Sequence, residues 1–88
     1  MQKRDFTIVN RLGLHARAAA QLVQCASGFR SEVFVEKEGE KVNAKSIMGI
    51  LMLAAPQGCL ITVTTQGEDE DQAMEALAEL INDGFGED

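Results

Sequence analysis

Apolar and polar residues follow two different periods along this chain. Alternating or β-branched apolar residues predict strands at residues 4–9, 32–36, 41–44 and 60–65. Apolar residues three and four positions apart predict a helix over 16–27 and a short helix over 47–53 with Ser46 as its N-cap. A third helix is predicted after Gly67, where acidic residues suit the positive end of the helix dipole, and Gly84 is its end signal.

The last helix is predicted to bury one stripe, formed by Ala73, Met74, Leu77, Leu80 and Ile81. The order of elements is β-α-β-β-α-β-α, without a repeat, a linker or a low-complexity segment, which describes one domain over residues 1–88. Elements in this order can bury their apolar faces when the helices form a layer on one face of a small, mainly antiparallel sheet. The sequence therefore predicts an α+β fold, an open-faced β-sandwich.

Charge divides the chain into a basic and an acidic end. The net charge of −6 argues against a nucleic-acid partner, because phosphate backbones require a basic face. Residues 1–30 nevertheless contain five Lys or Arg and a single acid, whereas residues 68–88 contain nine acids and no Lys or Arg. This asymmetry favours an anion-handling surface in the N-terminal third.

Targeting and metal-binding signals are missing from the sequence. Charge interrupts the N-terminus before an apolar run begins, and no stretch approaches the roughly 20 apolar residues of a membrane span. We therefore expect a cytoplasmic protein without membrane insertion. Cys25 and Cys59 form no C-x-x-C pair, and one histidine does not complete a zinc site with them. We expect two reduced packing cysteines, no metal and no cofactor.

His15 is the only histidine, and the predicted helix start places it at or beside the N-cap. The first N–H groups of that helix, those of Ala16, Arg17 and Ala18, lack intrahelical acceptors and form an anion site. We expect the imidazole to lie over these groups, where the dipole disfavours its charged form. A neutral ring nitrogen can attack phosphorus, although a lone histidine is more often an ordinary surface residue.

Two neighbours of the histidine fit this chemistry. Arg17 lies on the same helical turn, and its guanidinium can form paired hydrogen bonds with phosphoryl oxygens. Gly13 has no side chain, so the turn before the helix can bend sharply and leave the ring accessible.

Residues 13–19, Gly-Leu-His-Ala-Arg-Ala-Ala, resemble the signature Gly-Leu-His-x-Arg-Pro-Ala of the histidine-containing phosphocarrier family (HPr) of the phosphoenolpyruvate-dependent sugar phosphotransferase system. Residues 45–51 resemble its regulatory serine motif, and the likeness covers nearly the whole chain. The resemblance implies a carrier rather than an enzyme. His15 would accept a phosphoryl group from enzyme I on Nδ1 and pass it to an enzyme IIA domain, with Arg17 stabilising the group. It also implies a four-stranded antiparallel sheet in the order 1-4-2-3, covered by three helices.

Ser46 has two compatible interpretations. As an N-cap, it stabilises the short helix by about 1 kcal/mol relative to alanine. The resemblance implies that HPr kinase/phosphorylase phosphorylates it, which would add a charge of about −1.5 to −2 beside Met48 and Leu51. Such a charge would repel an acidic docking surface.

The helix after Ser46 is too short to bury all of its large apolar residues. Those left exposed, with small residues of the first helix near His15, would form an apolar docking patch for enzyme I and enzyme IIA. The predicted patch consists of Ala16, Ala20, Ile47, Met48 and Leu51. We expect the protein to be a monomer.

One residue departs from the family signature, since Ala18 stands in place of its proline. Alanine adds an N–H donor and removes a stiffening ring, so we expect a more flexible helix start without loss of transfer. A nitrogen-related phosphotransferase paralogue, which shares the histidine motif but serves regulation, is the first alternative. An acyl carrier protein is the second. It requires an all-helical pattern and an acidic residue before its serine, where this chain has Lys45.

Overall fold

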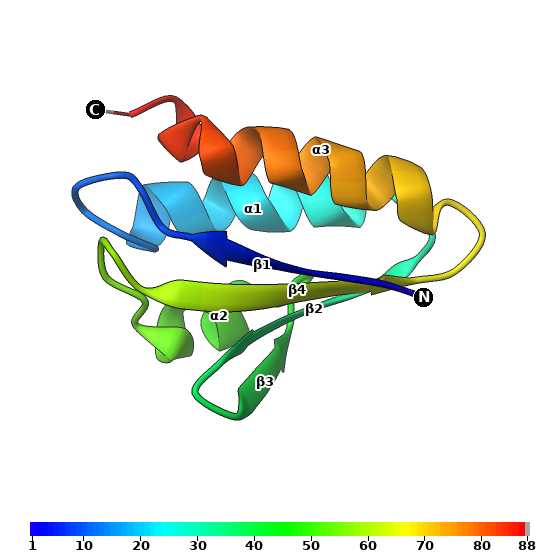
Figure 1. The fold of residues 1–88 in the computed structure, drawn as a ribbon, viewed down its shortest axis with the longest axis horizontal. Helices are drawn as coiled ribbons and strands as arrows, with labels where there is room; N and C mark the ends of the chain where they lie inside the picture. The colour runs from blue at the N-terminus through cyan, green and yellow to red at the C-terminus, as the bar shows by residue number, and fades with distance from the viewer. Residues whose placement is uncertain (88) are drawn as a thin grey trace.

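The four strands pair in the order β1-β4-β2-β3, and every pair is antiparallel. The computed structural model describes residues 1–87. Its elements are β1 (Gln2–Thr7), α1 (Ala16–Ser27), β2 (Glu32–Lys37), β3 (Glu40–Asn43), α2 (Ile47–Leu53), β4 (Leu60–Gln66), α3 (Glu70–Asn82) and the short turn η1 (Gly84–Gly86). Figure 1 shows α1 and α3 side by side along the sheet. The predicted open-faced sandwich with sheet order 1-4-2-3 is confirmed.

Alternation along the strands gives the sheet one buried face. Val35 of β2 lies opposite Val63 of β4, and both side chains are fully buried beneath the helices. On the other face, the hydroxyl of Thr62 donates to a carboxylate oxygen of Asp5 on the neighbouring strand, at 2.7 Å. The period of two thus separates an apolar core face from a polar outer face.

Small side chains let the helices approach the sheet and one another. α1 buries Ala18, Ala19, Leu22 and Ala26, and α3 buries Ala73, Met74, Leu77, Ala78 and Ile81. The predicted stripe of the last helix is therefore confirmed except at Leu80, which is only partly buried at the edge of the core. Ala78 is buried instead. None of the helices within residues 1–87 has the length and apolar character needed to cross a membrane.

Two strands have other bounds than the sequence predicted. The first strand was expected at 4–9 but spans Gln2–Thr7, because Ile8 exchanges hydrogen bonds with the turn before β4 rather than with β4 itself. Its N–H donates to Cys59 O at 2.9 Å, and its carbonyl accepts from Gly58 N at 2.8 Å. The third strand was expected at 41–44 but spans Glu40–Asn43, since Glu38 and Gly39 alone make the left-handed turn.

Candidate functional site

His15 is the N-cap of α1, as predicted, but its ring does not cap the helix. The backbone is extended at φ −76° and ψ −179°, and the side chain makes no capping hydrogen bond. Its carbonyl accepts the N–H of Ala19 at 2.8 Å, which begins the helical ladder. The ring thus makes no hydrogen bond to the first N–H groups of the helix, and its Nε2 is held by the C-terminal tail; the expected position of the imidazole beside those groups stays a prediction.

The tail residue Glu87 contacts the ring through both carboxylate oxygens. Nε2 of His15 lies 2.9 Å from Oε1 and 2.7 Å from Oε2. An ionised carboxylate only accepts hydrogen bonds, so Nε2 is the nitrogen that carries the hydrogen. The hydrogen bond from His15 holds the pKa of Glu87 below its ordinary value, with a smaller contribution from Asn10. Sequence reasoning missed Glu87, which lies 72 residues from His15 along the chain.

A shallow hollow of about 320 Å³ surrounds the histidine. It is lined by Arg11, Leu12, His15, Arg17, Gly86 and Glu87. Two arginines of the basic N-terminal third, Arg11 and Arg17, thus line the same hollow as His15. Among residues 1–87, the backbone N–H groups of Ala16, Arg17 and Ala18 have no acceptor, and their binding of an anion stays a prediction.

The loop before α1 fixes the histidine and the tail together. Gly13 adopts a left-handed backbone with φ +67°, and the following Leu14 N–H donates to Ala55 O at 2.9 Å. The buried amide of Asn10 donates through Nδ2 to Gly13 O at 2.8 Å and to Oε1 of Glu87 at 3.0 Å. One side chain therefore joins the loop to the tail.

Ser46 occupies the predicted N-cap of α2. Its Oγ accepts the N–H of Gly49 at 3.2 Å, and the residue is exposed. The capping interpretation is confirmed, and the hydroxyl also lies within reach of solvent. Whether it is modified stays a prediction.

The predicted docking patch lies on two helices that contact each other. Its exposed members are Ala16, Ala20, Ile47 and Met48, with Met48 at 64% exposure. Leu51 is partly buried against the core and contributes less surface than predicted. Met52, at 69% exposure, is a further exposed apolar residue of α2.

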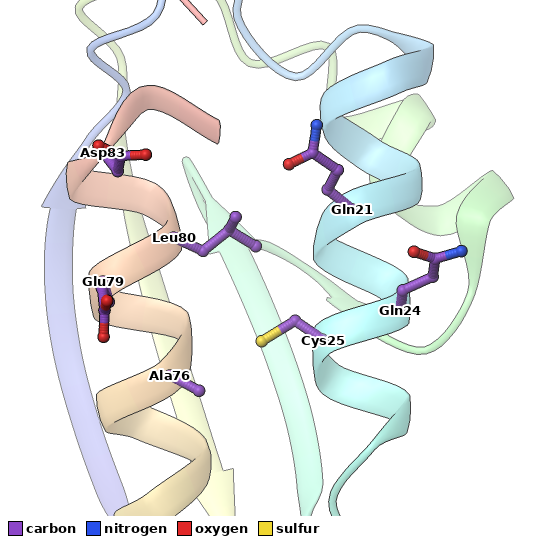
Figure 2. A pocket seen from close by; sticks show the side chains of 7 residues that line it. All are labelled: Gln21, Gln24, Cys25, Ala76, Glu79, Leu80 and Asp83. Carbon is purple, nitrogen blue, oxygen red and sulfur yellow. The ribbon is translucent and has the colours of Figure 1, made fainter. Parts of the chain in front are cut away.

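A second hollow, with a volume of about 740 Å³, lies between α1 and α3 (Figure 2). It is lined by Gln21, Gln24, Cys25, Ala76, Glu79, Leu80 and Asp83, and the side chains of Cys25 and Leu80 point toward each other across it. Burial raises the pKa of the Cys25 thiol, which keeps it protonated at neutral pH. His15 and Arg17 do not line this groove, so the hollow that they do line is the candidate site. Within residues 1–87, no cluster of three His, Cys, Asp or Glu side chains is arranged to hold a metal ion.

Comparison with known proteins decides the family. The family model described as the PTS HPr component phosphorylation site matches residues 2–83. The chain belongs to the HPr family. The phosphocarrier protein HPr of Cupriavidus necator is 54% identical over 87 residues, covering 99% of this chain and 98% of that protein. The crystal structure of HPr-C-His from Thermoanaerobacter tengcongensis is 49% identical with a TM-score of 0.97, covering 100% of this chain and 99% of that one.

Membership of the HPr family makes this chain a phosphocarrier, not a catalytic enzyme. The nitrogen-related alternative is not favoured, since the relative from Cupriavidus necator is a phosphocarrier HPr. The four strands rule out the all-helical acyl carrier alternative. An HPr dimer from Thermoanaerobacter tengcongensis is 49% identical with a TM-score of 0.80, so the expected monomer stays a prediction.

Proposed function

We propose that this chain carries a phosphoryl group from enzyme I to an enzyme IIA domain on Nδ1 of His15. The observation that supports this is the engagement of Nε2 by Glu87, which leaves the lone pair on Nδ1. Within residues 1–87, Nδ1 has no hydrogen-bond partner that would compete for that lone pair. The pair attacks phosphorus, the bond from phosphorus to the donor breaks, and Nε2 keeps its hydrogen.

The groups around the hollow stabilise the charge that His15 acquires. The phosphoryl oxygens meet the guanidinium of Arg17 and the N–H groups of residues 16–18. Arg17 is exposed and makes no ion pair with a carboxylate of residues 1–87, so it can move toward the phosphoryl group. No metal or cofactor takes part in this proposal.

Partners of the carrier dock on the patch formed by Ala16, Ala20, Ile47, Met48 and Leu51. Ser46 is the regulatory site of this proposal, phosphorylated by HPr kinase/phosphorylase at the edge of the patch. A phosphate there would add negative charge next to Met48, which repels an acidic partner surface without disturbing the core. The carrier acts in the cytoplasm as a monomer.

Incubation with phosphoenolpyruvate and enzyme I tests the carrier function. The wild-type protein is expected to gain an acid-labile phosphoryl group, and His15→Ala is expected to gain none while keeping the circular dichroism of a folded chain. A wild-type protein that stays unlabelled with a competent enzyme I overturns the proposal. Acid-stable label from ATP and a cognate kinase tests the regulatory part. That label must disappear in Ser46→Ala.

A further inference from the structure

The contact between the C-terminal tail and His15 is held in place by the fold, unlike an ion pair between two mobile surface side chains. Phe85 is buried at 2% exposure and adopts a left-handed backbone with φ +58°, flanked by Gly84 and Gly86, which also have positive φ. The buried side chain of Phe85 fixes the position of the tail, and with it that of Glu87 two residues further along. Figure 1 shows the tail at the same end of the molecule as the loop between β1 and α1. Glu87 therefore reaches His15 from a tail that the side chain of Phe85 anchors in the core.

Burial and a second donor strengthen the contact. The side chain of His15 is 27% exposed and that of Glu87 16% exposed. Asn10, itself buried, donates to the same Oε1 that faces the ring. The carboxylate is thus held from two sides, and its orientation does not depend on the histidine alone.

We propose that Glu87 is a positioning residue that keeps the hydrogen on Nε2 of His15 both before and after phosphorylation. This inference rests on the proposed function of His15. In the free protein, an acceptor-only partner at Nε2 leaves the lone pair on Nδ1, the nitrogen that attacks phosphorus. Glu87 acts through the ring and does not touch the reacting nitrogen.

In the phosphorylated protein the same contact prepares the leaving group. When the bond between Nδ1 and phosphorus breaks, its electron pair returns to Nδ1. With a hydrogen on Nε2, the group that leaves is a neutral imidazole. Without that hydrogen it is an imidazolate anion, which is a much poorer leaving group. Glu87 thus favours both loading and delivery.

The other charged groups at the hollow do not replace this contact. Arg11 and Arg17 line it, and as permanent cations they cannot accept a hydrogen bond from Nε2. No other carboxylate of residues 1–87 lines it. Glu87 stays ionised at neutral pH, because the hydrogen bond from His15 lowers its pKa.

The variant Glu87→Gln tests the proposal, with Glu79→Gln as its matched control. Glu79 is exposed on α3 and lines the groove between α1 and α3. Its substitution therefore makes the same change in charge at a position that does not line the hollow around His15. The ¹⁵N chemical shifts of the ring are compared at about pH 8, where an ordinary imidazole is neutral. Wild type and Glu79→Gln are expected to carry the hydrogen on Nε2. Glu87→Gln is expected to populate both tautomers, because an amide can donate as well as accept.

The second readout is the lifetime of the phosphohistidine without any partner. Each protein is phosphorylated chemically with phosphoramidate, and hydrolysis is followed by ³¹P NMR. Water attacks phosphorus, the Nδ1–phosphorus bond breaks, and neutral imidazole and dihydrogen phosphate are formed. We expect Glu87→Gln to hydrolyse about tenfold more slowly than wild type at neutral pH, and Glu79→Gln to match wild type.

A Glu87→Gln protein with wild-type ring shifts, or with a wild-type hydrolysis rate, overturns the inference. Both readouts omit enzyme I, so they separate this inference from the proposed function. A chain that fails to accept phosphate from enzyme I can still show the tautomer effect. A chain that accepts it normally can still refute the role of Glu87.

Discussion

Replacing Gly13 with alanine should destabilise the protein at the base of its site. The backbone there has φ +67°, and an added Cβ would lie 2.4 Å from Ala55 O and 2.9 Å from the Cα of Pro56. Both are backbone atoms, so no side chain can rotate away. The Gly13 segment must move away from the 55–56 segment, which breaks the hydrogen bond from Leu14 N to Ala55 O.

The cost of this substitution has three parts. A left-handed conformation costs alanine about 1–2 kcal/mol. Loss of the Leu14–Ala55 hydrogen bond adds about 0.5–1.5 kcal/mol. The displacement also loosens Leu14, which is buried at 4% exposure, so the free energy of unfolding should fall by about 3 kcal/mol in all.

Urea unfolding followed by far-ultraviolet circular dichroism measures the loss, and Gly39→Ala is the control. Gly39 has φ +83°, but an added Cβ meets nothing within 4 Å. Its substitution therefore carries the conformational cost of about 1–2 kcal/mol without a clash. The reasoning is refuted if Gly13→Ala loses no more stability than Gly39→Ala.

Three further substitutions should have smaller effects on urea unfolding. Ala18→Pro should stabilise by about 0.5–1 kcal/mol, because the N–H of Ala18 has no acceptor within residues 1–87; lost stability would contradict this. Ser46→Ala should cost about 1 kcal/mol by removing the cap of Gly49, and no cost would contradict it. Hydrogen bonds from Ser31 lower the pKa of Asp69 to about 2. The ionised carboxylate therefore contributes fully to the free energy of unfolding above the ordinary carboxyl pKa, and this contribution is lost as the pH falls toward about 2. The deficit of Asp69→Asn at neutral pH should therefore vanish in acid; a pH-independent deficit would contradict this.

Local signals predicted the helices well. The bounds of α1 and α2 match the sequence prediction, because the signals used, the helical spacing of apolar residues, Ser46 before α2 and Gly28 after α1, are local. Strand ends were less well predicted. Pairing ends where the partner strand turns, and the turn at Gly58 that removes Ile8 from β1 lies about 50 residues away in sequence. Such ends depend on the register of the sheet, which no single stretch of sequence contains.

The histidine site was predictable only in part. Its helix start, its basic border and its free N–H groups follow from residues 11–18, which are adjacent in sequence. The orientation of the ring does not, because Glu87 reaches it from the other end of the chain. The one signal in the sequence was Phe85, an apolar residue between two glycines directly after the end of the last helix. That pattern indicates a buried wedge, but not what the next side chain contacts.

Asn10 joins the loop before α1 to the C-terminal tail, so a change that destabilises the loop should also affect the contact between the tail and His15. Asn10 donates from one nitrogen to Gly13 O and to the Glu87 carboxylate. A shift of Gly13 away from Ala55 therefore moves the amide that holds the tail. Substitution of Gly13 should disturb the ring of His15 although it touches neither the ring nor Glu87. The contact of a glycine with a distant turn is thus part of what holds Nε2 of His15 against Glu87.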